Sequence, residues 1–425
     1  MNWLILIRGR PLPASICLAA HLAVASFLAH PSWAGDPASS QLGLEEAADL
    51  AISQQPQLLA QRAAVSALNE SVPAAGQLPD PKLRLGVVSL PVDTLDFTQE
   101  PMTQAVIGVS QMIPGGDKRR LAMARMEREA AQGSQSLAAI AQRIGRDARL
   151  AWLDLYWPRV AGDLVEQVEA EFQRQVEWSE VAYQTGKLTQ EETLALRGML
   201  ESTRDRLAEL SRQQARARAV LARWVGPAAD RALQALPAAS PPPSLERLVE
   251  GLDRHPELST LDETIEVAQA EVQLAKEAYK PDWSVDLGYG VRGGGRPDFV
   301  SVVVGVDLPL FTGNRQDRRL AARLAGAERA TQLRSDRQQA LRAELEAAYA
   351  DWQAADARIR RFEQDILPLA ARRVESALAA YGSDRASYGR VLEARRAEIE
   401  ARLQWQSLQV ARARALVQIS YYSAP

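Results

Sequence analysis

The sequence predicts a mainly α-helical protein with a small β part, built as a duplication: each half runs through short helices, a β-hairpin and two long coiled-coil helices. Three patterns predict this fold. Short motifs recur in one order about 200 positions apart. Four segments alternate between apolar and polar residues, and the longest uninterrupted segments repeat apolar residues about every 3.5 positions. The chain of 425 residues therefore corresponds to two structural repeats.

The chain begins with a segment typical of a secretory signal peptide, residues 1–34. Arg8 and Arg10 precede the mostly apolar residues 16–28, and Ser32-Trp33-Ala34 offers small residues around a cleavage site. A membrane anchor is the alternative, but the apolar stretch is shorter than the ~20 residues that a spanning helix needs. We therefore expect an exported protein.

Composition excludes several classes of protein. The formal net charge of −3 argues against a nucleic-acid partner, and 47% hydrophobic residues exclude a disordered chain. Removing residues 1–34 also removes the single cysteine, Cys17, and leaves His255 as the only histidine, a surface or capping residue by its position. Disulfides and Cys/His zinc sites are then impossible. With no nucleotide-binding or metalloprotease motif either, we expect no enzyme and no cofactor.

The repeat divides the chain into residues 35–226 and residues 245–425, joined by a Pro- and Ala-rich linker over 227–244. The matching pairs occur in one order: Gln55-Pro56 with His255-Pro256, Pro79-Asp80 with Pro281-Asp282, Gly108-Val109 with Gly305-Val306, and Tyr183 with Tyr381.

Each repeat contains one predicted β-hairpin, over residues 82–113 and 283–310. In the second hairpin, every other residue is apolar and the intervening face carries polar residues that include Asp286 and Asp307. Such alternation suits a lipid-facing barrel strand, although a soluble half-buried hairpin would alternate in the same way. The acidic connection of the first hairpin resembles an exterior loop.

The long helices are predicted over residues 117–182, 188–225, 315–380 and 387–420. At 1.5 Å per residue, the first is roughly 100 Å long. Its partner in the second repeat carries a heptad stripe that extends to Leu369. A cytoplasmic coiled coil would explain these helices, but it would not explain the export signal or the alternating strands.

Four strands cannot close a membrane barrel, because the smallest such barrels have eight. The open edges must therefore pair with other copies: a dimer would supply eight strands and a trimer twelve. Helices of this length would extend the barrel into a periplasmic tube. The expected architecture is an export conduit.

The whole mature chain resembles the TolC family of outer membrane efflux channels. The resemblance rests on the duplicated order of elements, on the Pro-Asp pairs before the strands, and on Tyr183 and Tyr381 at the turns between long helices. Gly186 follows the first tyrosine by three positions, whereas Asp384 stands at the equivalent position of the second repeat. The family implies a homotrimer in the outer membrane, with a 12-stranded β-barrel in lipid and a 12-helix periplasmic tunnel. It also implies a periplasmic adaptor protein and an inner-membrane RND-type transporter as partners.

Two segments look most like the heavy-metal efflux branch of that family, Gln111 to Arg119 and Asp307 to Phe311, the latter followed by Asn314-Arg315-Gln316. The resulting expectation is an exit channel that passively conducts heavy-metal cations. The alternatives are a TolC-like channel for type I protein secretion or drug efflux, and a non-transporting periplasmic coiled-coil protein.

In the family, the turns between the long helices constrict the tunnel. The aperture candidates are the tyrosines and the charged residues that follow them: Tyr183, Glu191, Glu192, Tyr381, Arg385, Arg390 and Glu393. Arg385 and Arg390 could pair with Glu191 and Glu192 of an adjacent turn, or all four could be solvated helix-end charges.

We expect no tight metal site in the channel. Asp286 and Asp307 on the polar strand face would favour cations weakly. Met102 and Met112 could offer thioether ligands, but methionine more often fills gaps in a core. His255, near the linker, is expected on the outside of the tunnel.

Overall fold

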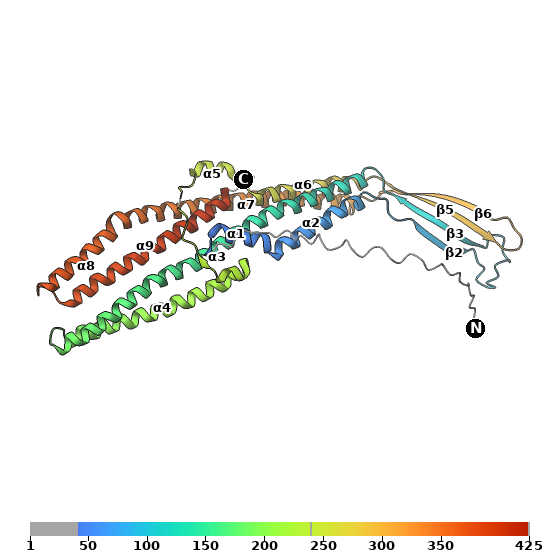
Figure 1. Ribbon diagram of the computed structural model, residues 1–425. Helices are drawn as coiled ribbons and strands as arrows, with labels where there is room; N and C mark the ends of the chain where they lie inside the picture. Colours follow the sequence, from blue (N-terminus) through green and yellow to red (C-terminus); the bar gives the residue numbers. More distant parts are fainter. Residues whose placement is uncertain (1–40, 239, 424–425) are drawn as a thin grey trace, which may run out of the picture. The chain divides into compact units, whose positions relative to one another are not determined.

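The computed structural model describes residues 41–238 and 240–423. The predicted signal peptide, residues 1–34, lies outside these residues. Helices dominate, and the order of elements repeats (Figure 1). The first repeat contains α1 (Leu44–Gln54), α2 (Pro56–Ala75), β2 (Lys82–Val88), β3 (Gln104–Ile113), α3 (Lys118–Gln184) and α4 (Gln190–Val225). The second contains α5 (Leu245–Gly251), α6 (Pro256–Glu277), β5 (Asp282–Arg292), β6 (Phe299–Asp307), α7 (Gln316–Arg361), α8 (Leu367–Gly382) and α9 (Tyr388–Ser423).

The linker expected over 227–244 is more structured than its composition suggests. It carries a 3₁₀ turn, η1 (Gly226–Asp230), and a short strand, β4 (Ala232–Leu233), which pairs with β1 (Gln41–Leu42). The carbonyl of Leu42 accepts hydrogen bonds from the Gln234 amide at 3.0 Å and from the indole of Trp152 at 3.0 Å. These contacts anchor the linker to the apolar core around the middle of α3.

Helix α3 runs for 67 residues without a break. Its expected heptad stripe is buried at Ile144, Ala148, Ala151 and Leu155, which pack against α1, α4 and neighbouring helices. Pro158 lies inside the helix and does not end it. Figure 1 shows α3 beside α4, and α8 beside α9, as two helical hairpins. Within the described part of the chain, no helix combines the length and apolarity needed to cross a membrane.

The heptad stripe predicted to extend to Leu369 is wrong at its end. A π-helical turn, η3 (Phe362–Ile366), separates α7 from α8. Ile359 and Phe362 are buried, but Leu369 is 64% exposed and Val374 is buried instead. A π turn accommodates one extra residue, so the buried stripe moves by one position. The turn also lies just before Pro368, which cannot donate a helical hydrogen bond.

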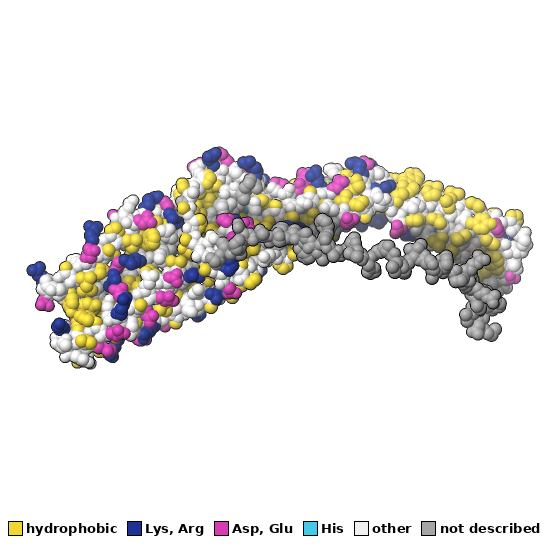
Figure 2. All heavy atoms as spheres, viewed as in Figure 1, with side chains coloured by type: hydrophobic (Ala, Val, Ile, Leu, Met, Phe, Trp, Pro, Cys, Tyr) yellow, Lys and Arg dark blue, Asp and Glu magenta, His cyan; other side chains and the backbone are white. Residues whose placement is uncertain are grey.

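The strands form one antiparallel sheet in the order β2-β3-β5-β6. Directly opposed residues share a face, so the register separates two surfaces. One surface is apolar, and Figure 2 shows hydrophobic side chains gathered over these strands. Its members include Leu83, Leu85, Ile107, Val109, Trp283, Leu287, Tyr289, Val300, Val302 and Val304. The outer strands, β2 and β6, each have one neighbour within the sheet.

His255 is the N-cap residue of α6, as expected, but its predicted surface position is wrong because the side chain is 1% exposed. Its Nδ1 accepts the Glu257 amide at 3.3 Å, and its Nε2 lies 3.2 Å from the Tyr421 carbonyl. The rings of His255 and Tyr421 meet edge to face. The histidine therefore joins the start of α6 to the end of α9.

Candidate functional site

The two turns between long helices have the same backbone geometry. Gly186 adopts φ +71° and Asp384 adopts φ +58°, both in the left-handed region. The next amide in each turn donates to an equivalent carbonyl, Lys187 to Ala182 and Arg385 to Ala380, each at 2.8 Å. Asp384 therefore differs from Gly186 in side chain but not in conformation, which aspartate tolerates better than most residues.

Glu192 binds both helix starts at the turns. Its Oε2 accepts the amide of Thr189 at 3.0 Å, and the Thr189 hydroxyl accepts the Glu192 amide at 3.2 Å, which forms a capping box on α4. Its Oε1 accepts the amide of Tyr388, the first residue of α9, at 3.1 Å. The hydrogen bond from the Thr189 amide, with a smaller contribution from Tyr388, lowers the pKa of Glu192. The carboxylate is thus held ionised between the turns.

Tyr388 also contacts residues at both turns, and no sequence pattern indicated it. It is buried, and its ring contacts Tyr381 edge to face at 5.2 Å and Trp178 at 5.5 Å. Its hydroxyl lies 3.3 Å from Oε1 of Gln175. Burial raises the pKa of Tyr388. One aromatic side chain therefore connects α9 with α3 and α8.

Arg395 makes a second connection between the hairpins. Its Nη2 lies 2.6 Å from Oε1 of Glu171 on α3, and its Nη1 lies 2.7 Å from Oε2 of Glu398. Glu398 is 4% exposed and also accepts Arg402 at 2.6 Å. No sequence pattern pairs Glu171 with Arg395, because the contact depends on how two distant helices align.

The remaining predicted aperture residues lie at the surface of the turns. Tyr183 is 48% exposed and Tyr381 is half-buried. Glu191, Arg385, Arg390 and Glu393 are exposed. Among the described residues of one protomer, neither Arg385 nor Arg390 lies within 4 Å of a carboxylate. Inside one protomer, the turns are therefore joined by Glu192 and the backbone of α9, and the arginine pairing stays a prediction for contacts between protomers.

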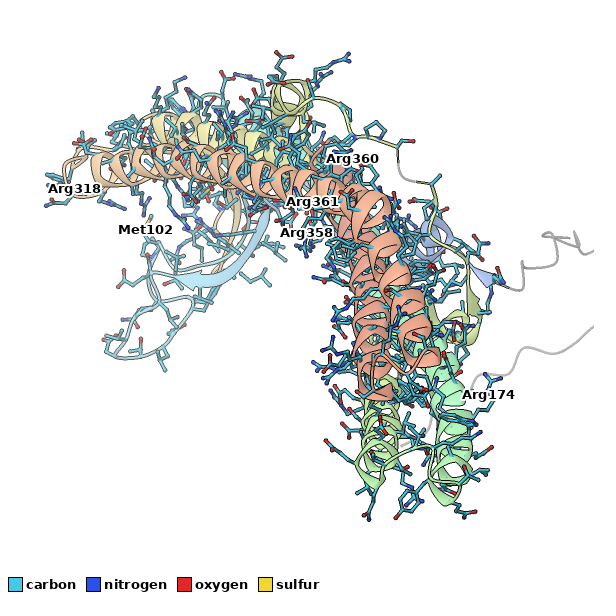
Figure 3. All side chains as sticks on the ribbon, turned by 90° about the vertical axis from the view of Figure 1, so that its left-hand side faces the viewer. Met102, Arg174, Arg318, Arg358, Arg360 and Arg361 are labelled. Atoms are coloured by element: carbon cyan, nitrogen blue, oxygen red, sulfur yellow. The ribbon has the colours of Figure 1, made fainter. Side chains whose placement is uncertain are left out.

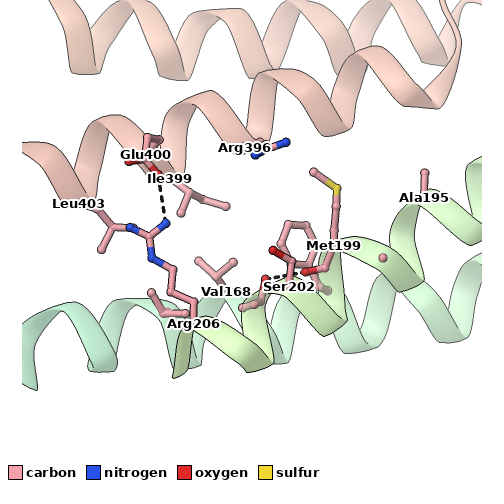
Figure 4. Close-up of a pocket in the computed structure, with 13 residues that line it drawn as sticks. Val168, Ala195, Met199, Ser202, Arg206, Arg396, Ile399, Glu400 and Leu403 are labelled. Carbon is pink, nitrogen blue, oxygen red and sulfur yellow. Dashed lines mark hydrogen bonds and ion pairs between the residues drawn. The ribbon is translucent and has the colours of Figure 1, made fainter. Parts of the chain in front are cut away.

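A groove of about 330 Å³ lies between α4 and α9, lined by apolar residues that include Val168, Met199 and Ile399 (Figure 4). Arg206 and Glu400 bridge it, with Nη1 and Oε2 at 3.1 Å. Both side chains are about half exposed, so this pair contributes at most ~1 kcal/mol. The groove continues the seam between the hairpins away from the turns.

The polar face of the sheet carries both signs of charge. Asp286 lies on it, with Oδ1 at 2.9 Å from Nη2 of Arg84, which also donates to Ser110 at 3.2 Å. The register places Lys82 and Arg292 on the same face. Asp307 is exposed and opposite Asp282, whose carboxylate binds Lys118 at 2.7 Å. The acidic surface expected from Asp286 and Asp307 is therefore shared with basic residues.

The methionines do not come together. Met112 lies on the polar face opposite Ser284, whereas Met102 precedes the other end of β3, roughly 30 Å away at 3.3 Å per residue. Within the described residues, no group of three or more His, Cys, Asp or Glu side chains could hold a metal ion.

Comparison with known proteins links the second repeat to a protein family. Residues 248–423 match the family described as outer membrane efflux protein. The matched region is the second repeat of the chain, from α5 to α9. The predicted resemblance to the TolC family and the predicted outer-membrane location are both confirmed. No curated protein sequence matches the chain.

Solved structures of outer membrane efflux proteins share the fold at low identity. The outer membrane protein VceC of Vibrio cholerae is 18% identical, with a TM-score of 0.75 over 89% of this chain and 96% of its own. The CmeC outer membrane channel of Campylobacter jejuni is 13% identical, with a TM-score of 0.76 over 96% of this chain and 93% of its own. CusC is 15% identical, with a TM-score of 0.74 over 89% and 91%. The fold is therefore shared with outer membrane channel proteins.

Proposed function

We propose that the protein is the outer-membrane exit channel of a tripartite efflux system, which passively conducts substrates delivered by an inner-membrane RND-type pump and a periplasmic adaptor. The observation that carries the proposal is the sheet. One face is apolar and exposed, at 54% for Leu287 and 75% for Val300, while the other is polar. An apolar face next to lipid and a polar face next to water are the two surfaces of a channel strand.

The open edges of β2 and β6 support a homotrimer. In a bilayer, unpaired backbone groups cost several kcal/mol each, so both edges need neighbouring strands. Three copies supply the twelve strands of the barrel and the twelve long helices of the tunnel that the family implies. The detergent-extracted mature protein should then have three times its monomer mass, and a monomer that keeps its β-structure would contradict the barrel.

For the cargo, we propose heavy-metal cations. The support is the resemblance of residues 111–119 and 307–316 to the heavy-metal branch, together with CusC among the similar folds. The mixed charges around Arg84 and Asp286 favour weak ion selectivity, which leaves selection to the pump. Deletion of the gene should sensitise cells to metal ions. Sensitivity to drugs alone, or loss of a secreted protein, would favour the alternative cargoes.

We further propose that Glu192 holds the periplasmic aperture narrow by joining the two turns of each protomer. Glu192→Gln removes the charge and leaves one oxygen to serve two helix starts, so the link between Thr189 and Tyr388 is broken. Glu375→Gln is the matched control, because Glu375 is exposed on α8 and lies outside the turns.

Single-channel conductance in planar bilayers tests the proposed channel and the proposed role of Glu192. We expect wild-type channels of low conductance, higher conductance for Glu192→Gln, and no change for Glu375→Gln. Equal conductance of all three proteins would contradict the role of Glu192. The absence of any conductance from trimeric wild-type protein would contradict the channel itself.

A further inference from the structure

The second sheet-to-helix junction exposes an apolar segment. Between β6 and α7, Leu308 is 63% exposed, Leu310 is 73% exposed and Phe311 is 83% exposed. Leu308 continues the alternation of the apolar face, which ends at Val306 opposite Trp283. An aromatic residue at the end of a lipid-facing strand is typical of a membrane–water boundary. The segment therefore extends the apolar surface to that boundary.

Three arginines follow this segment directly. Arg315, Arg318 and Arg319 are exposed, and no carboxylate of the described residues lies within 4 Å of them. The one acid in the first turn of α7, Asp317, is engaged elsewhere, because its Oδ1 accepts the Tyr279 hydroxyl at 2.6 Å. Figure 3 shows Arg318 at the start of α7. The cluster thus has three positive charges without a counter-charge.

The first repeat has the equivalent junction between β3 and α3, but its positive charges have partners. Its three cations at the start of α3 are all bound within the chain. Lys118 binds Asp282 at 2.7 Å, Arg119 donates to the Gly76 carbonyl at 2.9 Å, and Arg120 binds Asp117 at 3.0 Å. In the first repeat, groups of the same chain bind all three cations. In the second repeat, the three arginines have no such carboxylate partner among the described residues.

Free cations in the first turn of a helix are unfavourable, because the helix dipole is positive at that end. An anion outside the chain would remove this cost. The arginines follow exposed leucine and phenylalanine within the same junction, so the complementary partner has a negative charge next to an apolar chain. An anionic phospholipid has both parts, whereas a free anion has only one.

We propose that Arg315, Arg318 and Arg319 bind the phosphate headgroups of anionic phospholipids, while Leu308, Leu310 and Phe311 lie among the acyl chains of the same leaflet. The proposal rests on the proposed function, because it requires the sheet to lie in lipid. It adds a lipid site that distinguishes the two repeats: one junction per protomer binds lipid and the other binds its own chain.

The test uses the mature full-length protein in nanodiscs of phosphatidylcholine alone or mixed with phosphatidylglycerol. Native mass spectrometry counts the phosphatidylglycerol retained on each trimer. The test variant is Arg315→Gln/Arg318→Gln/Arg319→Gln. The matched control, Arg358→Gln/Arg361→Gln/Arg373→Gln, removes the same charge; Figure 3 shows Arg358 and Arg361 at the other end of α7.

We expect the wild type and the control to retain phosphatidylglycerol, and the test variant to bind it at least about tenfold more weakly, because each arginine near a membrane surface contributes roughly a fivefold factor. Inorganic phosphate should not displace the lipid. Equal retention by all three proteins, or equal loss in test and control variants, would overturn the proposal. Displacement by phosphate alone would also overturn it, since it would show a site for the free anion.

Two measurements keep the outcome clear. Arg318→Gln alone should lower retention partially, which covers the case in which the triple variant does not assemble. Conductance of the wild type in the same lipids separates the two proposals. A conducting trimer without lipid preference contradicts only the lipid site, whereas a protein that forms no channel contradicts the proposed function.

Discussion

The sheet and the helix turns differ in where their side chains find partners. In the sheet, apolar residues such as Leu287 and Val302 are more than half exposed, and two backbone edges are open. At the turns, Glu192, Tyr388 and Arg395 bind partners in the same chain. The turns are therefore joined within one chain, whereas the apolar face and the open edges of the sheet lack a partner in that chain and would meet lipid and other copies in the proposed trimer.

This difference predicts where a substitution should matter. In the sheet, the effect should depend on the face, because the surroundings differ from one face to the other. At the turns, it should depend on the backbone conformation and hydrogen bonds of one chain.

The largest effect is expected on the apolar face of the sheet. Leu287→Arg places a charge among lipid chains and should lower the free energy of unfolding by about 2–4 kcal/mol per protomer. Val303→Arg is the matched control, because Val303 is 56% exposed on the opposite face, paired with Asp286. Urea unfolding in vesicles measures both. Equal losses would show that the two faces have the same surroundings.

A smaller effect is expected at the turns. Gly186→Ala forces a side chain into the left-handed region and should cost about 1 kcal/mol, whereas Asp384→Gly should gain less than about 1 kcal/mol. Thermal unfolding of the helices, followed by circular dichroism, measures the two changes. The same sign for both substitutions would contradict the equivalence of the two turns.

The smallest effect is expected from His255 and depends on pH. Burial lowers the pKa of His255 below its ordinary value of 6.5, although the nearby Glu257 opposes this. Arg146 of α3, Arg337 of α7 and Tyr421 of α9 also face the ring. As the pH falls below 6.5, the unfolded chain binds a proton before the folded chain does, so stability falls until the folded-state pKa is reached.

The measurement compares thermal unfolding above and below pH 6.5 in the wild type and in His255→Asn, which can still cap α6 but cannot titrate. The wild type should lose more stability on acidification. Hydrogen bonds from Arg337 and Tyr421 outweigh burial and lower the pKa of Glu257. The stability that ionised Glu257 contributes is therefore lost only below pH 4.5, the ordinary pKa of its carboxyl group. Parallel profiles for the two proteins would show that His255 does not titrate in this range.

Much of the fold could be predicted because it follows from periodicity. The alternation in residues 283–310 and the heptads around Leu341 and Leu345 report directly which side chains share a face. Turn residues such as Gly186 and the Pro-Asp pairs mark where elements begin and end. Features of this kind depend on residues close together in the sequence, so the sequence pattern predicts them.

The partners of the site residues could not be predicted, because they depend on the alignment of helices more than 150 residues apart. Glu192 was singled out, yet its partner, the amide of Tyr388, is a backbone group that leaves no trace in composition. The contact between Glu171 and Arg395 depends in the same way on the alignment of α3 with α9. The burial of His255 was missed because the path of the chain end, at Tyr421 and Tyr422, has no sequence signal.

The π turn at 362–366 has a consequence for the direction in which the aperture residues point. One residue corresponds to about 100° of rotation around an α-helix. All of α8 is therefore rotated about its axis relative to α7, and in this orientation the ring of Tyr381 meets the ring of Tyr388. Deleting one residue of the turn would leave α8 helical but point Tyr381 away by about 100°. A single residue far from the turns would thus set the angular position of the aromatic contact between them.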